Sequence, residues 1–568
     1  MTGRIPGAGG APAPDRTHAT GRRARSRTAR LLAAAGVGAL AIGALAGCGQ
    51  SAVGRDAGTF ELTARTPQPA GDIDSFTWAL ATEPYSLDPA YAFDYADNTV
   101  LSNMCESLLR WNSDLSQSPG LATAVDHPDP LSWVYTIREG VRFHDGTPMT
   151  PNDVVVSLSR HLDPEVASFW YDSFKNVDTI EQTGEHEVTV RTVVPDSQFN
   201  QLMSAAPGVI QSAQSTEQAG ADYGNQSTGV NCTGPFSFGE WRAGESITLE
   251  RFDDYWDPEL RAKAEQMTFV VLNDPNARVN ALQTGEIDGA WTIPSNAIDV
   301  LRASDTGSVY FGTNATVQSL IVSDMEGPLG DARVRQALTM AIDREALVRA
   351  AVQGYGSPSD ALTSESVWIN GDPDAVREAF DDLPDHDYDL EAARELVREA
   401  RAEGAKITYV TASLDSSFDV ISQAVASAGR EIGLDIEIET RTPNAYTLLF
   451  SDPTAIEGVD LFATTWYLSS TDPLEMYAVI RTGEFSNYGQ WSNPEFDDVV
   501  NRALQTDDAG ERSFLSAEAQ RIASEELPWI PLIDLPTTLW MGDRITGVDP
   551  SISYMYYPWA ATIGRAER

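Results

Sequence analysis

Histidine, cysteine and carboxylate side chains are the first candidates for chemistry in this sequence, and no catalytic or metal-binding pattern unites them. The sequence contains no Gly-x-Ser-x-Gly, no His-Glu-x-x-His and no Walker-type glycine loop. Acidic pairs such as Asp253-Asp254 are typical of a solvated surface. The patterns predict a protein that is not an enzyme, with an anchored hydrolase of dispersed catalytic residues as a minor alternative. The histidines are scattered: His18, His127, His144, His161, His186 and His386.

One cysteine lies in an export signal. An arginine cluster that begins at Arg22-Arg23 precedes an uncharged run, 31–47, which ends Leu-Ala-Gly before Cys48. A basic segment, a short apolar segment and small residues before a cut are typical of a secretory signal, and this cut looks like a bacterial lipobox. We therefore expect residues 1–47 to be removed and Cys48 to carry lipid. The 17-residue run is rich in Ala and Gly, which disfavours a membrane-spanning anchor. Sec and twin-arginine export both stay open.

The net charge of the chain limits the kinds of partner that it can bind. The full sequence carries a formal charge of −44, and loss of residues 1–47 takes away seven Arg and one Asp, giving about −50. Such a chain repels nucleic acid and anionic lipid surfaces, so neither is expected as a partner. The remaining 521 residues are enough for two large lobes.

The two other cysteines, Cys105 and Cys232, lie in the part of the chain that is expected to be exported. In an oxidising compartment such a pair is expected to form a disulfide, and two buried thiols are the alternative. A bridge closing a 127-residue loop contributes about 4–5 kcal/mol in the chain-entropy model.

The rest of the chain predicts a tether and then a mixed α/β fold. Residues 48–71 lack periodicity, and we expect a flexible tether of roughly 25 Å. Alternation over 133–138 predicts a strand. Asp331, Asp389 and Asn493 each precede an apolar stripe at helical spacing and are predicted N-caps.

Several sequence blocks, in order, resemble the extracellular solute-binding proteins of family 5, which include the peptide- and nickel-type binding proteins of ABC importers. The resemblance extends from about Ile73 to the C-terminus. Its blocks are Arg138–Val154, Cys232-Thr233-Gly234-Pro235-Phe236, Tyr255-Trp256, Arg278–Leu282 with Gly285–Asp288, Asp331–Leu338 and Ser492–Asp497.

The resemblance implies a two-lobed periplasmic-binding-protein-like α/β fold of type II, with central mixed sheets flanked by helices and an extra subdomain. It places lobe I at about 72–315 plus 535–568, the inserted subdomain at about 112–215 and lobe II at about 316–534. The implied function is solute capture between closing lobes and delivery to an ABC permease, without a cofactor or metal. A monomer is expected, exported and held by the lipid on Cys48 at the outer face of the bacterial cytoplasmic membrane.

Matching the family residue by residue also implies a ligand site. For each aromatic residue, core packing is the competing interpretation. The expected first-lobe contacts are Glu83, Tyr85, Thr233 and Gly234, with Trp170 or Tyr171 from the subdomain. The expected second-lobe contacts are Trp466, Tyr467, Ser469 and Asp472, with Tyr488 and Trp491 as weaker choices.

The solute itself is constrained by one position. In peptide-binding relatives an Asp three residues after the strand-end Trp pairs with the peptide ammonium, and here that position is Ser469. No Arg or Lys occurs in 407–429, where dipeptide-binding relatives hold the carboxylate. Because an unpaired buried charge costs several kcal/mol, we expect free di- and tripeptides to bind poorly. An oligosaccharide or a blocked or modified peptide is favoured. Metal-chelate binding and a signalling role are the alternatives.

Overall fold

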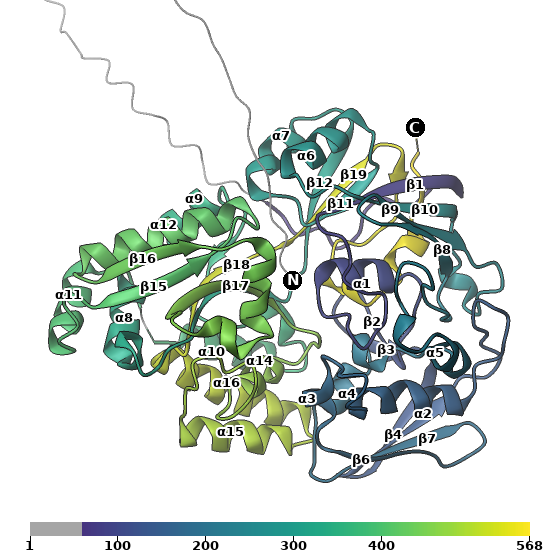
Figure 1. The fold of residues 1–568 in the computed structure, drawn as a ribbon, viewed down its shortest axis with the longest axis horizontal. Helices are drawn as coiled ribbons and strands as arrows, with labels where there is room; N and C mark the ends of the chain where they lie inside the picture. Colours follow the sequence, from purple (N-terminus) through teal and green to yellow (C-terminus); the bar gives the residue numbers. More distant parts are fainter. Residues whose placement is uncertain (1–59, 385, 568) are drawn as a thin grey trace, which may run out of the picture. The chain divides into compact units, whose positions relative to one another are not determined.

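A seven-stranded mixed sheet forms the first lobe in this computed structural model, which describes residues 60–384 and 386–567 (Figure 1). β1 lies at its centre and runs parallel to β10 and β11. Because β1 is covered on both faces, it buries three consecutive residues, Trp78, Ala79 and Leu80. The strand order is β12 (Gly307–Gly312), β19 (Thr537–Gly542), β11 (Gly289–Trp291), β1 (Ile73–Leu80), β10 (Ala264–Val271), β9 (Ser246–Arg251) and β8 (Phe236–Arg242).

The end of the chain completes this sheet. β19 lies between β11 and β12 and runs antiparallel to both. The following turns η10 (Ile552–Met555) and η11 (Trp559–Thr562) return to the core, where the Trp559 ring lies 4.5 Å from the Trp78 ring. The first lobe is therefore discontinuous in sequence.

A six-stranded sheet forms the second lobe. All seven residues of β13 are buried, as expected for a central strand. The predicted caps Asp331, Asp389 and Asn493 each accept backbone N–H bonds at the start of a helix. The strand order is β14 (Ser357–Pro358), β18 (Trp529–Asp534), β13 (Thr316–Val322), β17 (Leu461–Tyr467), β15 (Lys406–Thr411) and β16 (Asp435–Thr440). The main helices are α8 (Ala332–Ala341), α9 (Arg344–Ala351), α10 (Pro373–Asp381), α11 (Leu390–Glu399), α12 (Ser416–Glu431), α14 (Leu474–Val479), α15 (Pro494–Leu504) and α16 (Ala509–Glu526).

A third, four-stranded sheet is inserted into the first lobe and has its own hydrophobic core. The alternation over 133–138 forms β5, as the sequence predicts. α2 (Pro151–Ser159) covers this sheet and begins with a capping box of Thr150 and Asp153. The strand order is β4 (Ala122–Asp129), β5 (Ser132–Ile137), β7 (Glu187–Thr192) and β6 (Val177–Gln182).

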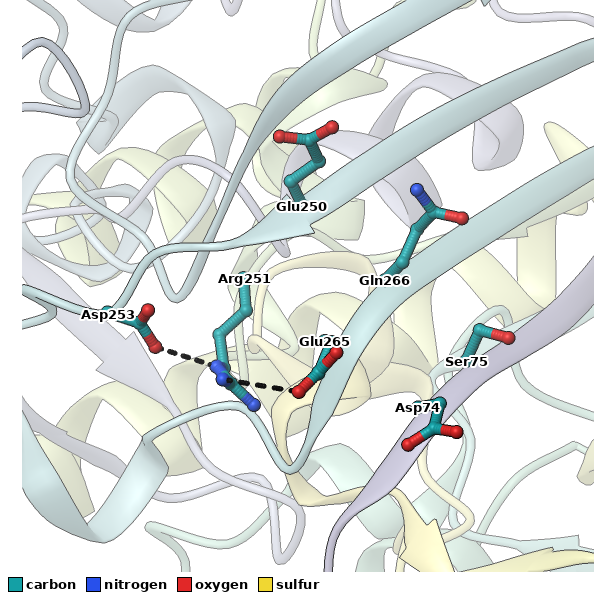
Figure 2. A pocket seen from close by; sticks show the side chains of 7 residues that line it. All are labelled: Asp74, Ser75, Glu250, Arg251, Asp253, Glu265 and Gln266. Atoms are coloured by element: carbon teal, nitrogen blue, oxygen red, sulfur yellow. Dashed lines mark hydrogen bonds and ion pairs between the residues drawn. The ribbon is translucent and has the colours of Figure 1, made fainter.

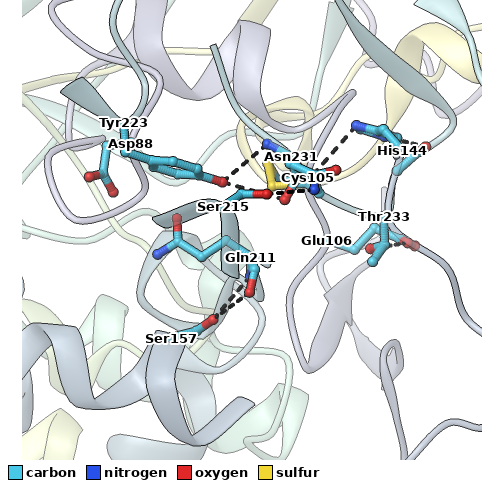
Figure 3. Close-up of a disulfide and its surroundings, with 12 residues drawn as sticks. Asp88, Cys105, Glu106, His144, Ser157, Gln211, Ser215, Tyr223, Asn231 and Thr233 are labelled. Carbon is cyan, nitrogen blue, oxygen red and sulfur yellow. Dashed lines mark hydrogen bonds between the residues drawn. A yellow bond between two sulfur atoms is a disulfide. The ribbon is translucent and has the colours of Figure 1, made fainter. Parts of the chain in front are cut away.

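A disulfide joins Cys105 and Cys232 in the first lobe (Figure 3). Both residues are buried, at 2% and 0% exposure. Glu106, the residue after Cys105, accepts hydrogen bonds from Thr233, Tyr255 and Trp256. The bridge therefore belongs to a buried polar network.

The N-terminal segment differs from the expected tether where it is described. The Thr63 N–H donates to the Phe311 carbonyl at 2.6 Å, and the Ala70 N–H donates to the Arg565 carbonyl at 2.7 Å. Residues 60–71 thus lie along the first lobe. The predicted signal peptide, the lipidation site Cys48 and the start of the tether lie outside the described residues. Within the described ranges, no helix combines the length and hydropathy that a membrane crossing needs.

Candidate functional site

Side chains from both lobes meet where β17 ends and α1 (Tyr95–Leu101) begins. The Tyr467 hydroxyl, in the second lobe, donates to the Phe93 carbonyl in the first. The Tyr95 and Tyr467 rings lie edge to face, 5.1 Å apart. The Tyr556 hydroxyl, just after η10, lies 3.4 Å from the Tyr467 hydroxyl and 3.3 Å from Ser469 Oγ. The interlobe cluster consists of Asp94, Tyr95, Tyr467, Ser469, Glu475 and Tyr556.

Strand alternation decides which β17 side chain faces the first lobe. Tyr467 points to α1, whereas Trp466 packs edge-on against Trp529, 5.2 Å between ring centroids. The chain then turns into α14, whose second residue is Glu475. The Ser469 N–H donates to Glu475 Oε1 at 2.9 Å, so the helix returns a carboxylate to the strand end.

Two carboxylates lie in the interlobe cluster. Glu475 Oε2 is buried and has no hydrogen-bond partner among the described residues. Burial raises the pKa of Glu475 to about 7, and the charge of Asp472 adds to this, while the hydrogen bond from the Ser469 N–H and the nearby polar groups of Ser470 oppose it. Asp94 caps α1 and is accessible to solvent, yet desolvation also raises its pKa. Asp94 therefore lies at the accessible edge of the cluster, in which Ser469 and Tyr556 are buried and Tyr95, Tyr467 and Glu475 are partly buried.

A third carboxylate lies behind α1. Asp97 Oδ1 accepts the Tyr85 N–H at 2.7 Å, and Asp97 Oδ2 has no partner within the described chain. Burial, and then repulsion by Asp94, raise the pKa of Asp97 to about 8. Burial also raises the pKa of the phenols of the cluster, Tyr95, Tyr467 and Tyr556.

The residues expected at the Thr-Gly-Pro turn hold the disulfide region together. Thr233 is fully buried and donates to Glu106 Oε2 at 2.9 Å. The Gly234 N–H donates to the Met104 carbonyl at 2.8 Å, and a Cβ on Gly234 would lie 2.6 Å from that carbonyl group. The backbone of Gly234 is thus packed against Met104. Thr233 and Gly234 therefore lie beside the disulfide.

Glu83 and Tyr85, both expected at the rim of the ligand site, have different surroundings in the structure. Glu83 Oε1 accepts from Trp241 Nε1 and from the Gly244 N–H, both at 2.8 Å. Its carboxylate therefore anchors the turn between β8 and β9. The Tyr85 side chain is 77% exposed, so it contacts little in this conformation.

Asp472 forms a buried ion pair. Its Oδ2 lies 2.5 Å from Arg512 Nε, and both side chains are about 5% exposed. Its Oδ1 accepts the Leu474 N–H at the start of α14. With both oxygens occupied, Asp472 positions the helix that carries Glu475.

The remaining aromatic candidates pack within or beside the cores. Trp170 is half-buried, and its Nε1 lacks a hydrogen-bond partner among residues 60–384 and 386–567. Tyr171 is 52% exposed on α3 (Tyr171–Phe174). Tyr488 stacks on Trp529, and Trp491 packs on Phe496.

The lobes also touch farther from the cluster, between the inserted sheet region and the second lobe. The Ser197 N–H donates to the Leu504 carbonyl at 2.8 Å. His127 Nε2 lies 3.1 Å from Asp507, and Lys175 pairs with Glu484. The structure therefore has the two lobes in contact at several places.

A separate hollow of about 580 Å³ opens on the seven-stranded sheet (Figure 2). Cross-strand neighbours Ser75, Gln266 and Glu250 line it. Arg251 lies between Asp253 and Glu265, at 2.8 and 3.9 Å. The lining of this hollow is polar and mostly acidic, and it shares no residue with the interlobe cluster.

Of the residues predicted from the sequence, the structure places Tyr467 and Ser469 in the interlobe cluster, together with Asp94, Glu475 and Tyr556, which the sequence did not point to. Glu475 follows Ser469 by six residues, so only the turn before α14 brings them together. A Pro after an acidic residue, as in Asp472-Pro473, was the available sign that a helix starts there.

Comparisons with known proteins agree with this architecture. Residues 116–488 match the model of the "Bacterial extracellular solute-binding proteins, family 5 Middle". The chain is 28% identical over 454 residues to the "Glutathione-binding protein GsiB" of Pectobacterium atrosepticum, covering 78% of this chain and 85% of that protein.

Solved structures show the same type II periplasmic-binding-protein fold. AgaA from A. tumefacien R10, in complex with agropinic acid, has 22% identity and a TM-score of 0.76 over 87% of this chain and 99% of its own. AppA from Bacillus subtilis, with a nonapeptide, has 22% identity and a TM-score of 0.75 over 88% and 100%. Since the family model covers more than half of its length, this chain belongs to the bacterial extracellular solute-binding proteins of family 5.

Proposed function

We propose that this protein is the substrate-binding component of an ABC importer and captures a peptide-like solute between its two lobes. Membership of the family supports the class, and the names of the relatives, which include glutathione- and peptide-binding proteins, support the solute. The mechanism is a hinge motion without covalent chemistry, in which the solute stabilises the closed state.

One observation carries the proposal for this chain. The interlobe cluster joins hydroxyls and carboxylates of both lobes at a single place, through Tyr467, Phe93 and Tyr556. A solute bound there would contact both lobes and favour closure by its differential affinity for the closed state. The proposed lobes are 72–315 with 535–568, and 316–534.

The test uses the exported chain without its lipidated Cys48, residues 49–568, and small-angle scattering. Reduced glutathione, a tripeptide library and maltotriose are added separately, and melting temperature is followed in parallel. A solute that binds the native state raises the melting temperature, and closure lowers the radius of gyration. If no probe of any class changes either quantity, the proposal fails.

Attachment through Cys48 forms the second part of the proposal. The lipid would hold the protein at the outer face of the cytoplasmic membrane as a monomer beside its permease. Mass spectrometry of the membrane-extracted protein should find a lipid-modified residue 48 as the first residue. Cys48→Ala should move the protein to the soluble fraction, and unchanged membrane association of this variant would refute the anchor.

A further inference from the structure

The strongest unassigned group in the molecule is the half-satisfied carboxylate of Glu475. Its Oε1 is held by the Ser469 N–H, whereas its Oε2 is buried without a hydrogen-bond partner in the described ranges. A buried carboxylate oxygen without a donor is costly, and native proteins satisfy nearly all such atoms. The absence of a donor to Glu475 Oε2 therefore needs a physical explanation.

We infer that the solute carries an ammonium group, and that Glu475 is the residue that binds it. This inference rests on the proposed function and specifies its substrate class. It also changes one expectation from the sequence: Ser469 lacks the carboxylate, but α14 supplies one against the same strand end.

Charges around the interlobe cluster favour a cation. Asp94 adds a second carboxylate on the first-lobe side. Arg512, which lies beside Asp472 at the start of α14, is engaged by that carboxylate. An ammonium would therefore meet uncompensated negative charge, whereas a carboxylate would meet repulsion.

Aromatic rings complete the environment. Tyr95 and Tyr467 present rings 5.1 Å apart, and the Tyr556 hydroxyl reaches Ser469, which is bonded to Glu475. Ring faces attract ammonium groups, most strongly when water is excluded. A polyhydroxyl solute would gain stacking from these rings but no charge partner for Glu475.

The position of Glu475 links binding to closure. Glu475 belongs to the second lobe, and Tyr556 and Asp94 belong to the first. Opening the lobes breaks the Tyr556 bonds to Ser469 and Tyr467, and so gives the solute access to Glu475. An ammonium held there on closing also lies close to first-lobe groups.

A purely structural Glu475 makes a different prediction. If the carboxylate only accepted the Ser469 N–H, an amide oxygen would replace it, and Glu475→Gln would leave solute preference unchanged. The inference instead predicts that the ionised carboxylate, and not merely an acceptor, is needed.

The pH dependence separates these cases. The pKa of Glu475 is raised to about 7, so below that pH a cation must displace a proton. Affinity should rise about tenfold per pH unit below 7 and fall again above about pH 8, where the peptide α-ammonium loses its proton. Asp94 and Asp97 also have raised pKa values, Asp472 is paired with Arg512, and Tyr556 stays neutral in this range. Only a comparison with Glu475→Gln assigns the effect.

The experiment is calorimetry with one tripeptide library in two forms, free and N-acetylated, between pH 5.5 and 8.5. The wild type should prefer the free amine at least tenfold at pH 7.5. Glu475→Gln should lose both the preference and the rise through pH 7. The matched control is Glu378→Gln, an exposed residue on α10 of the same lobe, which should behave as the wild type.

Two results would overturn the inference. One is equal binding of the free and acetylated peptides by the wild type, or no binding of either. The other is an unchanged preference in Glu475→Gln. If Glu475→Gln melts without cooperativity, Glu475→Asp takes its place, with weakened binding but a retained preference for the amine. Closure by maltotriose without amine binding would refute the ammonium and leave solute capture standing.

Discussion

Replacing Asp472 by Asn separates a structural role from a ligand-binding role at this position. Asp472 Oδ2 lies 2.5 Å from Arg512 Nε, and Arg512 Nη1 also donates to the Thr506 carbonyl at 3.1 Å. Both partners are nearly inaccessible to solvent. Asp472→Asn therefore leaves a buried guanidinium without its counter-charge.

The expected cost is large. Breaking a buried ion pair by removing one partner costs about 3–5 kcal/mol. For a cooperative unit of 150–250 residues, this lowers the melting temperature by roughly 6–20 °C. Exposed ion pairs contribute about 0–1 kcal/mol, so Asp374→Asn, whose partner Arg377 is 62% exposed, should change the melting temperature little.

The assay is thermal unfolding by circular dichroism, followed by calorimetry with the free tripeptide library well below the melting point. We expect a strong loss of stability, and peptide affinity should fall along with it because Arg512 then lies unpaired close to the helix that carries Glu475. A variant that melts within 2 °C of the wild type but no longer binds peptide would refute the reasoning. Asp472 would then contact the solute directly.

Three further changes test the scaffold around the cluster. Cys105→Ser with Cys232→Ser opens a 127-residue loop and should cost about 5 kcal/mol in chemical denaturation; an unchanged midpoint would contradict the loop model. Gly234→Ala forces a Cβ to 2.6 Å from the Met104 carbonyl and should lower the melting temperature, whereas Gly510→Ala, whose Cβ meets only the Asp508 side chain at 3.3 Å, should not. Glu83→Ala removes the acceptor of Trp241 and Gly244 and should cost about 1–3 kcal/mol without altering peptide affinity; loss of affinity alone would restore Glu83 to the ligand site.

Local patterns in the sequence predict elements well where side chains carry the signal. Alternation predicted β5, and Asp331, Asp389 and Asn493 predicted helix starts, because capping depends on nearby residues. Residues 60–71 gave no such signal. Their attachment uses backbone groups, as in Thr63 to Phe311, and these bonds do not depend on side-chain type.

The residues of the interlobe cluster were harder to predict from the sequence than the helices and strands were. Tyr467 and Ser469 were predicted as ligand contacts from their place at a strand end, and the structure places both in the interlobe cluster. Glu475 was not predicted, because only a turn that returns α14 to that strand brings it next to Ser469. Asp472 was expected in the ligand site, and its ion pair with Arg512 spans 40 residues of sequence that no local pattern connects.

The late arrival of β19 sets an order of events during synthesis. β11 and β12 are complete by Gly312, but the strand between them ends at Gly542. At about 5–20 residues per second, a ribosome needs roughly 10–50 s to make the intervening chain. For that time the N-terminal strands expose unpaired edges, which favour wrong pairing. The second lobe is continuous in sequence and can fold before the chain is complete. The last 30 or so residues then add β19 and complete the sheet of the first lobe.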